Sequence, residues 1–170
     1  MEKYVGLIRV RVYRGINLAI RDSRTSDPYV VVTMGDKKLK TRVVRSNCNP
    51  EWKDELTLCA SDLNIPILLE VYDEDHFTKD DQIGEANVDI KPYLECLKNK
   101  SLNNPSKDGF VVSTFQPSRH NCLARESRIV WKSGKLVQDM TLRLKNVECG
   151  EVDIQIEWID LAGSTSSKVN

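Results

Sequence analysis

The chain has 170 residues, 25 Lys plus Arg against 25 Asp plus Glu, and 40% hydrophobic residues. This length is typical of one globular domain, and the apolar content is too high for an intrinsically disordered chain. The zero charge balance excludes proteins that coat nucleic acid through a basic excess over the whole domain. Any electrostatic function must therefore come from local separation of charge, and we expect no nucleic-acid partner.

The sequence predicts peripheral contact with membranes at most. Its first residues, Met1-Glu2-Lys3-Tyr4, lead directly into a strand pattern, so we expect no secretory signal, and Glu2 stands where N-myristoylation requires glycine. The longest apolar stretches, at residues 29–32 and 65–69, are shorter than the roughly 20 residues that span a bilayer. We therefore expect a cytoplasmic protein, small enough for passive entry into the nucleus.

The five cysteines are an odd number at wide spacings, without a CxxC pair or a nearby histidine cluster: Cys48, Cys59, Cys96, Cys122 and Cys149. This pattern argues against a zinc site or a disulfide framework. We expect free and mostly buried thiols in a reducing compartment.

Short strands are predicted along most of the chain. Apolar and polar residues alternate at residues 8–12 and 152–158, which indicates half-buried strands. Further runs predict strands at residues 29–34, 40–44, 55–59, 67–72, 83–90 and 140–144. Turn-rich clusters separate these runs, as in an antiparallel sandwich.

Residues 91–145 differ from this pattern and are interpreted as an insertion. A short helix is predicted after Pro92, and residues 99–109 are polar. The tetrapeptide Lys132-Ser133-Gly134-Lys135 separates two apolar runs and predicts a hairpin turn. The Ser/Thr-rich residues from 162 to the end are expected to be frayed.

Acidic residues concentrate in two predicted loops: Asp22 and Asp27 after the first strand, and Asp73, Asp75 and Asp81 after the strand at 67–72. If the loops meet at one end of a sandwich, five carboxylates repel one another unless a cation neutralises them. Calcium fits better than magnesium, because flexible loops supply oxygens at irregular geometry. It fits better than zinc because no Cys or imidazole pair accompanies the aspartates.

The order Asp73-Glu74-Asp75 allows the two aspartates to converge while the Glu74 side chain faces away, because alternate residues point to the same side. The backbone carbonyls of Arg21 and Glu74 are then candidate additional ligands. The spacing after Asp73 does not fit an EF-hand loop. The alternative interpretation is that both loops are solvated and carry turn and capping aspartates. The two interpretations differ in whether the fold brings the loops together.

Five motifs occur in the order and spacing of a C2 domain: Gly15-Ile16-Asn17-Leu18, Ser26-Asp27-Pro28-Tyr29-Val30, Asn49-Pro50-Glu51-Trp52, Val71-Tyr72-Asp73-Glu74-Asp75 and Asp80-Asp81-Gln82-Ile83-Gly84. The resemblance covers residues 5–93 and 147–160. It implies an all-β fold, an eight-stranded antiparallel C2 β-sandwich whose upper loops bind calcium. Asp22, Asp27, Asp73, Asp75 and Asp81 match the ligand positions of the family.

The segment between Tyr93 and Cys149 is longer than in an ordinary C2 domain, and in this the chain resembles the plant C2-domain abscisic-acid-related proteins. The resemblance implies one C2 domain over residues 1–162, a β-hairpin and short helix inserted at about 91–147, and a disordered tail at 163–170. It also implies calcium-dependent phospholipid binding and recruitment of abscisic acid receptors of the PYR/PYL/RCAR type to the plasma membrane, as a positive regulator of abscisic acid signalling. Some relatives are described as activators of GTPases.

Two groups of residues are candidates for lipid contact. His76 and Phe77 lie at the expected tip of the third loop, where they either enter the headgroup layer or pack on their own loop. A basic patch comprises Lys37, Lys38, Lys40, Arg42 and Arg45, and alternation places Lys38, Lys40 and Arg42 on one strand face. Such a face suits anionic lipid, and the alternative is a solvated strand protected by its charges.

The insertion carries five cations around an apolar run, which is typical of a partner surface: Arg119, Arg125, Arg128, Lys132 and Lys135. The alternative is that Trp131 packs into the sandwich and the charges face water. We find no P-loop, GxSxG or HExxH motif, and the only histidines are His76 and His120, so we expect no catalysis by the chain itself. The competing functions are an accessory activator of a GTPase and a calcium-independent interaction scaffold.

Overall fold

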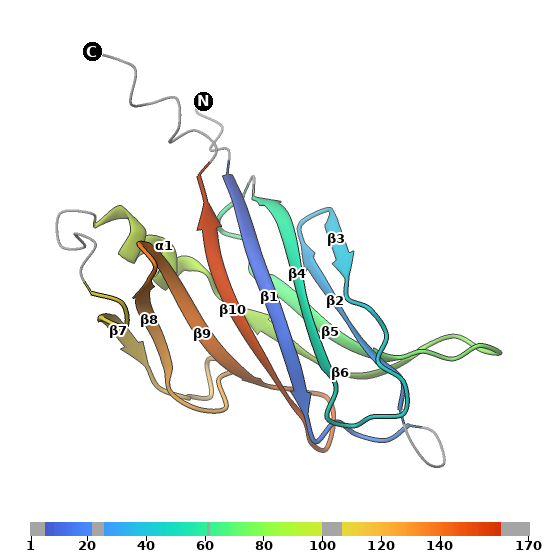
Figure 1. Cartoon of the computed structure of the whole chain (residues 1–170). Helices are drawn as coiled ribbons and strands as arrows, with labels where there is room; N and C mark the ends of the chain where they lie inside the picture. Colours follow the sequence, from blue (N-terminus) through green and yellow to red (C-terminus); the bar gives the residue numbers. More distant parts are fainter. Residues whose placement is uncertain (1–5, 22–25, 61, 100–106, 161–170) are drawn as a thin grey trace.

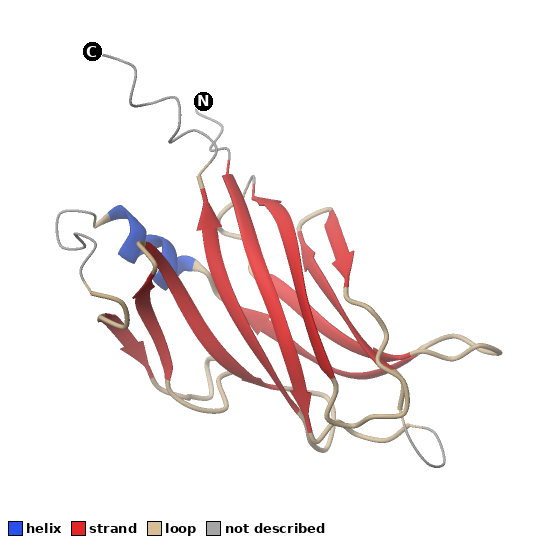
Figure 2. Ribbon diagram, in the orientation of Figure 1, coloured by secondary structure: helices blue, strands red, loops and turns tan. Residues whose placement is uncertain are grey.

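The computed structural model describes residues 6–21, 26–60, 62–99 and 107–160. These residues form two antiparallel sheets that pack face to face, and one short helix (Figures 1 and 2). The first sheet has the order β4 (Glu51–Ala60), β1 (Gly6–Ile16), β10 (Glu151–Ile159), β9 (Lys135–Arg143), β8 (Ser127–Lys132) and β7 (Val111–Phe115). The second has the order β3 (Lys37–Lys40), β2 (Pro28–Met34), β5 (Ile67–Asp73) and β6 (Asp81–Val88).

The core lies between the two sheets and follows the alternation of the sequence. Ile8, Val10 and Val12 of β1 are fully buried, and Val10 is the register partner of Ile156 on β10. Trp52 is also buried, and its indole N–H donates to the carbonyl of Pro28 (3.0 Å). The expected all-β sandwich is therefore confirmed.

The insertion extends the first sheet, so that the described residues form ten strands rather than the eight expected for the sandwich. Helix α1 (Lys91–Lys98) has proline in its first turn and follows β6, while β7 and β8 continue the sheet outward from β9. Ser133 and Gly134 have φ values of 50° and 76°, as a type I′ turn requires, and close the β8–β9 hairpin in the predicted place. The short helix and the hairpin are both confirmed.

The strand predicted at residues 40–44 is wrong, because β3 ends at Lys40. Thr41 leaves the sheet with its side chain buried, and its hydroxyl oxygen accepts a hydrogen bond from the backbone N–H of Val30 (2.9 Å). Arg42 then turns to Asp54 on β4, whose carboxylate accepts the Arg42 backbone N–H (2.8 Å) and Nη2 (2.9 Å). Residues 41–44 keep two backbone hydrogen bonds to β2, from Thr41 N–H to the Val30 carbonyl (2.9 Å) and from Val44 N–H to the Pro28 carbonyl (3.1 Å), but the side-chain hydrogen bonds interrupt the regular ladder of a longer strand.

The cysteines are less buried than expected. None of the five, all within the described residues, is in a disulfide; four are half-buried, and Cys59 is exposed. The prediction of free thiols agrees with the structure, whereas the prediction of mostly buried thiols is wrong. Cys96 on α1 and the loop residues Cys122 and Cys149 pack at the margin of the core.

The acidic loops and the strand ends near the termini lie at opposite ends of the sandwich (Figure 1). Leu7 pairs with Ile159 at one end, and residues 41–50 and 74–80 form loops at the other. No described helix is long and apolar enough to cross a membrane. The frayed tail expected from residue 162 lies outside the described residues.

Tyr93 fixes α1 to the extended sheet and provides a test of the fold. Its buried hydroxyl donates to the carbonyl of Leu136 on β9 (2.7 Å) and accepts the backbone N–H of Trp158 on β10 (2.7 Å). Tyr93→Phe removes both hydrogen bonds and should lower the free energy of unfolding by about 1–3 kcal/mol, measured by urea denaturation. Tyr13→Phe, at a partly exposed tyrosine, is the matched control and should change it by less than about 0.5 kcal/mol. Equal effects would contradict this role of Tyr93.

Candidate metal and lipid site at the loop end

The fold brings the two acidic loops into direct contact. Pro28 on β2 is the register partner of Asp73 on β5, which places Asp27 beside Asp73. The backbone N–H of Asp27 donates to Asp73 Oδ1 (2.8 Å), and the N–H of Glu74 donates to the carbonyl of Asp27 (3.0 Å). Asp73 is only 1% exposed. The structure therefore does not support the interpretation that the two acidic loops are separate and independently solvated.

The Asp75 carboxylate is bound within its own loop. It accepts the backbone N–H of Phe77 (2.9 Å) and the hydroxyl of Thr78 (2.7 Å), and these hydrogen bonds lower the pKa of Asp75. Asp80 accepts the N–H of Asp75 (2.9 Å) and the phenol of Tyr29, and both bonds lower the pKa of Asp80. The loop is thus held by hydrogen bonds to ionised carboxylates.

Arg45 supplies positive charge to this group of carboxylates. Its guanidinium lies 3.1 Å from Glu74 Oε1, 3.9 Å from Asp27 Oδ2 and 3.2 Å from His76 Nε2. Asp27 Oδ1 also accepts the backbone N–H of Ser46 (2.7 Å). These contacts offset like-charge repulsion among the described residues without a bound ion.

The predicted metal ligands that the structure describes do not form a single cluster. Asp27 and Asp73 are in contact. Asp75 lies on the loop that follows β5. Asp81, at the start of β6, is exposed and is the register partner of Asp73. Arg21 directs its guanidinium to Glu148 (3.2 Å). Asp22 lies outside the described residues, so the complete ligand set stays a prediction.

The donor set has the chemistry that calcium prefers, with carboxylate oxygens on neighbouring loops. However, no three His, Cys, Asp or Glu side chains within the described ranges are arranged as a metal-binding group. Asp75 in particular must release the hydroxyl of Thr78 to free that oxygen. The residues therefore fit calcium by donor type, after rearrangement of the loop at 74–80.

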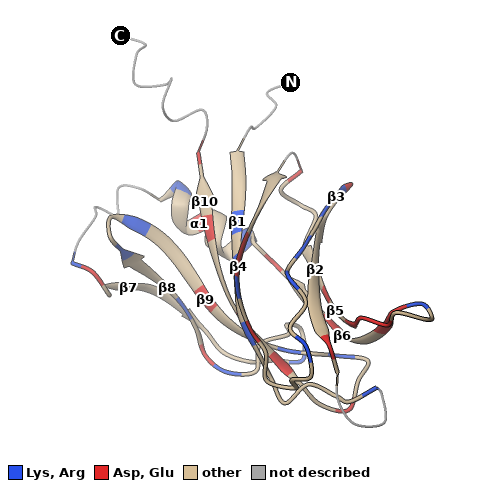
Figure 3. Cartoon of the chain, turned by 45° about the vertical axis from the view of Figure 1, so that its right-hand side comes forward, with Lys and Arg blue, Asp and Glu red and all other residues tan. Residues whose placement is uncertain are grey.

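The basic patch is smaller than expected. Lys37, Lys38 and Lys40 are exposed on edge strand β3, whereas Arg42 is bound to Asp54 and does not continue the strand face. This corrects the prediction that Arg42 shares a face with Lys38 and Lys40. Figure 3 shows basic residues on β3 and acidic residues near the end of β5.

Two stacked tyrosines lie beside the lysines. The Lys40 ammonium is 5.8 Å from the ring centroid of Tyr29, and the ring of Tyr29 stacks on Tyr72 with centroids 5.7 Å apart. Burial and a hydrogen bond to Glu70 raise the pKa of Tyr72 to about 12. The face therefore combines cations with neutral phenols.

Phe77 is 96% exposed at the tip of the loop, so it does not pack on its own loop. His76 is also exposed, with its ring beside Arg45. The exposed ring of Phe77 is therefore available for contact with a lipid surface. This favours the first of the two interpretations of the loop tip.

The cations of the insertion are mostly in ion pairs. Arg125 pairs with Glu151 (3.2 Å), Arg128 with Glu126 (2.7 Å) and Lys132 with Asp139 (3.4 Å). Trp131 packs against the core, as the alternative interpretation predicted.

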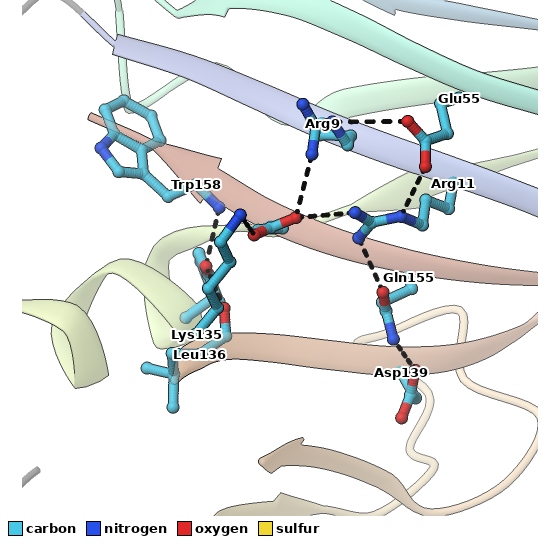
Figure 4. A network of polar contacts seen from close by, with 10 residues as sticks. Arg9, Arg11, Glu55, Lys135, Leu136, Asp139, Gln155 and Trp158 are labelled. Atoms are coloured by element: carbon cyan, nitrogen blue, oxygen red, sulfur yellow. Dashed lines mark hydrogen bonds and ion pairs between the residues drawn. The ribbon is translucent and has the colours of Figure 1, made fainter. Parts of the chain in front are cut away.

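Lys135 joins a larger network on the outer face of the first sheet. It lies 3.4 Å from Glu157, a carboxylate only 2% exposed that also pairs with Arg9 (3.4 Å) and Arg11 (2.9 Å) (Figure 4). Glu55 extends the network on β4, 3.0 Å from Arg11. These charges pair with one another on the sheet surface, so none of them is an isolated charge that a partner could bind.

Comparisons with known proteins give the family. The C2 domain family matches residues 6–109. Protein C2-DOMAIN ABA-RELATED 4 of Arabidopsis thaliana is 56% identical over 164 residues, covering 96% of this chain and 92% of that protein. The chain belongs to the C2-domain ABA-related family. GTPase activating protein 1 of Oryza sativa subsp. indica is 53% identical, covering 94% of this chain and 95% of that protein.

Solved structures agree with this fold. The calcium-bound C2 domains of Extended-Synaptotagmin 2 give a TM-score of 0.64 at 18% identity, covering 98% of this chain and 51% of that chain. A structure described as a C2 domain gives a TM-score of 0.54 at 23% identity, covering 91% of this chain and 98% of that chain. At these identities the likeness shows the fold alone.

Sequence reasoning missed two residues as members of the site. Asp80 holds the loop, although the doublet Asp80-Asp81 drew attention only to its second member. Arg45 was assigned to the basic patch, but its side chain lies among the carboxylates. No local pattern distinguishes these roles, because Arg45 contacts carboxylates of separate loops and Asp80 accepts the phenol of Tyr29 on β2.

The lowered pKa values of Asp75 and Asp80 predict the pH dependence of the loop. Their hydrogen bonds contribute stability above the ordinary carboxyl range of about pH 4, and this contribution is lost as the pH falls through the lowered pKa values. In an NMR titration, the amide signals of Phe77 and Thr78 should move with a midpoint below that of a peptide spanning residues 73–81. Amides of β1 should stay at their folded positions over the same range. A shared midpoint in protein and peptide would contradict the assignment.

Proposed function

We propose that the chain is a calcium-dependent phospholipid-binding adapter that recruits abscisic acid receptors to the plasma membrane, without catalysis of its own. The contact between Asp27 and Asp73 carries this proposal, because it joins the two acidic loops beside an exposed phenylalanine. The C2 family and the names of the relatives support a membrane-binding function in abscisic acid signalling.

The ligands proposed for calcium are the carboxylates of Asp22, Asp27, Asp73, Asp75 and Asp81, with the carbonyls of Arg21 and Glu74. Bound calcium supplies positive charge to the loop end and offers coordination positions to lipid phosphate. Asp27 and Asp73 provide a rigid part of the site, since each is held by backbone hydrogen bonds. Asp75 provides a mobile part, because its bonds to Phe77 and Thr78 must exchange.

Lipid contact is assigned to Phe77 and to the exposed lysines of β3. Burial of a phenylalanine side chain contributes about 1.5–3 kcal/mol, and each basic residue near an anionic surface contributes about 1 kcal/mol. Phe77 and Lys38 with Lys40 together therefore suffice for reversible attachment, and calcium removes the repulsion between the acidic loops and the lipid. The protein would divide between cytoplasm and plasma membrane accordingly.

A second candidate function is the activation of a partner GTPase, which is supported by the name of the rice relative. Stimulated GTP hydrolysis by a purified GTPase would test it. Lack of stimulation at saturating protein would exclude it for that GTPase.

Cosedimentation with phosphatidylserine vesicles tests the adapter function. The wild-type chain should pellet with calcium and stay in solution with chelator, and Asp27→Asn should lose about tenfold or more of its vesicle affinity because a ligand charge is removed. Asp62→Asn is the matched control, since it makes the same change in an exposed turn at the other end of β4.

Equal pelleting in calcium and chelator would contradict calcium dependence and assign binding to Lys38 and Lys40. Absence of pelleting in every condition would contradict the membrane function. A pull-down of a soluble abscisic acid receptor onto the same vesicles tests recruitment separately.

Arg45 should oppose calcium binding, because its guanidinium lies beside Glu74 and Asp27. Arg45→Gln should therefore tighten calcium binding about three- to tenfold in isothermal titration calorimetry at low ionic strength. Arg14→Gln, which removes an exposed arginine paired with Asp153, is the control and should leave the affinity unchanged. Weaker calcium binding in Arg45→Gln would contradict this role.

A further inference from the structure

A cavity lies between the insertion and the sandwich. Its volume is about 420 Å³, which is within the range of small-molecule sites. Met140 and Leu142 of β9 contribute apolar surface, and the remaining walls come from the β6 end, the start of α1 and the segment after β7. The cavity is distinct from the acidic loops and includes none of the proposed calcium ligands.

The wall formed by residues 116–124 is held in place by its backbone. The N–H of Arg143 donates to the carbonyl of Cys122 (2.6 Å), and the N–H of Ala124 donates to the carbonyl of Thr141 (2.8 Å). Asn121 closes the segment on itself, since its Oδ1 accepts the N–H groups of Ser118 and Leu123 (3.1 Å each). The cavity is therefore formed before any ligand binds.

The lining carries an excess of positive charge. Arg119, Arg143 and Lys145 line the cavity, and none of them has a carboxylate partner in the described part of the chain. The guanidinium of Arg143 is oriented by the carbonyls of Leu123 and Asn121 (3.4 Å each). Among the described residues of the lining, only Asp89 is acidic, and its Oδ1 accepts the backbone N–H of Lys91 (3.0 Å). The electrostatics therefore favour an anion.

Gln138 adds a buried acceptor to the same lining. Its side-chain Nε2 donates to the Ser127 hydroxyl (3.0 Å), which itself donates to the Asp139 carbonyl (2.7 Å), so the amide orientation is determined. Gln138 Oε1 then has no hydrogen-bond partner among the residues that the structure describes, although the residue is only 4% exposed. An unused buried acceptor is costly, and a hydrogen-bond donor of a ligand in the cavity would relieve that cost at Gln138 Oε1.

We propose that this cavity binds a small organic anion with an apolar body and one hydrogen-bond donor. The anionic group pairs with Arg119, Arg143 and Lys145, and the apolar body packs on Met140 and Leu142. The hydrogen-bond donor of the ligand pairs with Gln138 Oε1. Arg119, which forms no ion pair within the described residues, thus acquires a role in binding. The insertion then forms one wall of a ligand site.

Anilinonaphthalene sulfonate is the probe for this proposal, because it combines a sulfonate, aromatic rings and an anilino N–H. Titration of the folded protein in chelator should give a saturable rise in fluorescence with one site. Arg119→Gln and Lys145→Gln should each weaken the probe about tenfold. Arg125→Gln is the matched control, because Arg125 lies on the same insertion but pairs with Glu151 outside the cavity.

The N-methyl derivative of the probe, which lacks the N–H, tests the donor. It should bind wild type more weakly than the parent probe, and Gln138→Leu should abolish this difference. Urea midpoints of all variants must match wild type or exceed it, so that weaker binding is not caused by unfolding. Unsaturable binding, or equal affinity in Arg119→Gln and Arg125→Gln, would overturn the proposal. Because calcium and vesicles are absent, this result is independent of the adapter function.

Discussion

The pairing of β1 with β10 organises the whole molecule. The first and last strands lie side by side as the second and third strands of the six-stranded sheet, with Val10 opposite Ile156. The inner face buries apolar side chains completely, and the outer face buries Glu157 among Arg9, Arg11 and Lys135. Removal of one of these cations would leave a buried carboxylate less well paired. The strands between β1 and β10 in the sequence therefore either extend this sheet on both sides of the pair or form the second sheet.

At the loop end, the sandwich concentrates negative charge and limits its cost. Antiparallel register brings Asp27 to Asp73, backbone N–H groups stabilise the ionised carboxylates, and Arg45 adds a positive charge. The loop is therefore stable in its own right but poised to exchange these partners for a cation. For the proposed calcium binding, the contacts that hold the loop set the free energy that the ion must exceed.

The insertion acts mainly through its attachment to the sheet. Tyr93 connects α1 to β9 and β10, and the β8–β9 hairpin continues the pairing of the sheet outward. Its tryptophan and most of its cations are used internally. What remains for recognition is the cavity near Arg119 and Arg143, which neither the insertion nor the sandwich could form alone.

Alternation, turn residues and local charge were enough to predict most of the strands, the hairpin turn and the acidic loops, because each of these features is encoded within a few neighbouring residues, whereas the strand β7 was not predicted. The prediction failed at residues 41–44, where side-chain hydrogen bonds of Thr41 and Asp54 to groups on separate parts of the chain interrupt the regular ladder with β2. The contact of Asp27 with Asp73, the position of Arg45 and the unused acceptor of Gln138 arise only in the folded chain. Each depends on residues far apart in the chain, and their spacing in sequence carries no information about which groups meet.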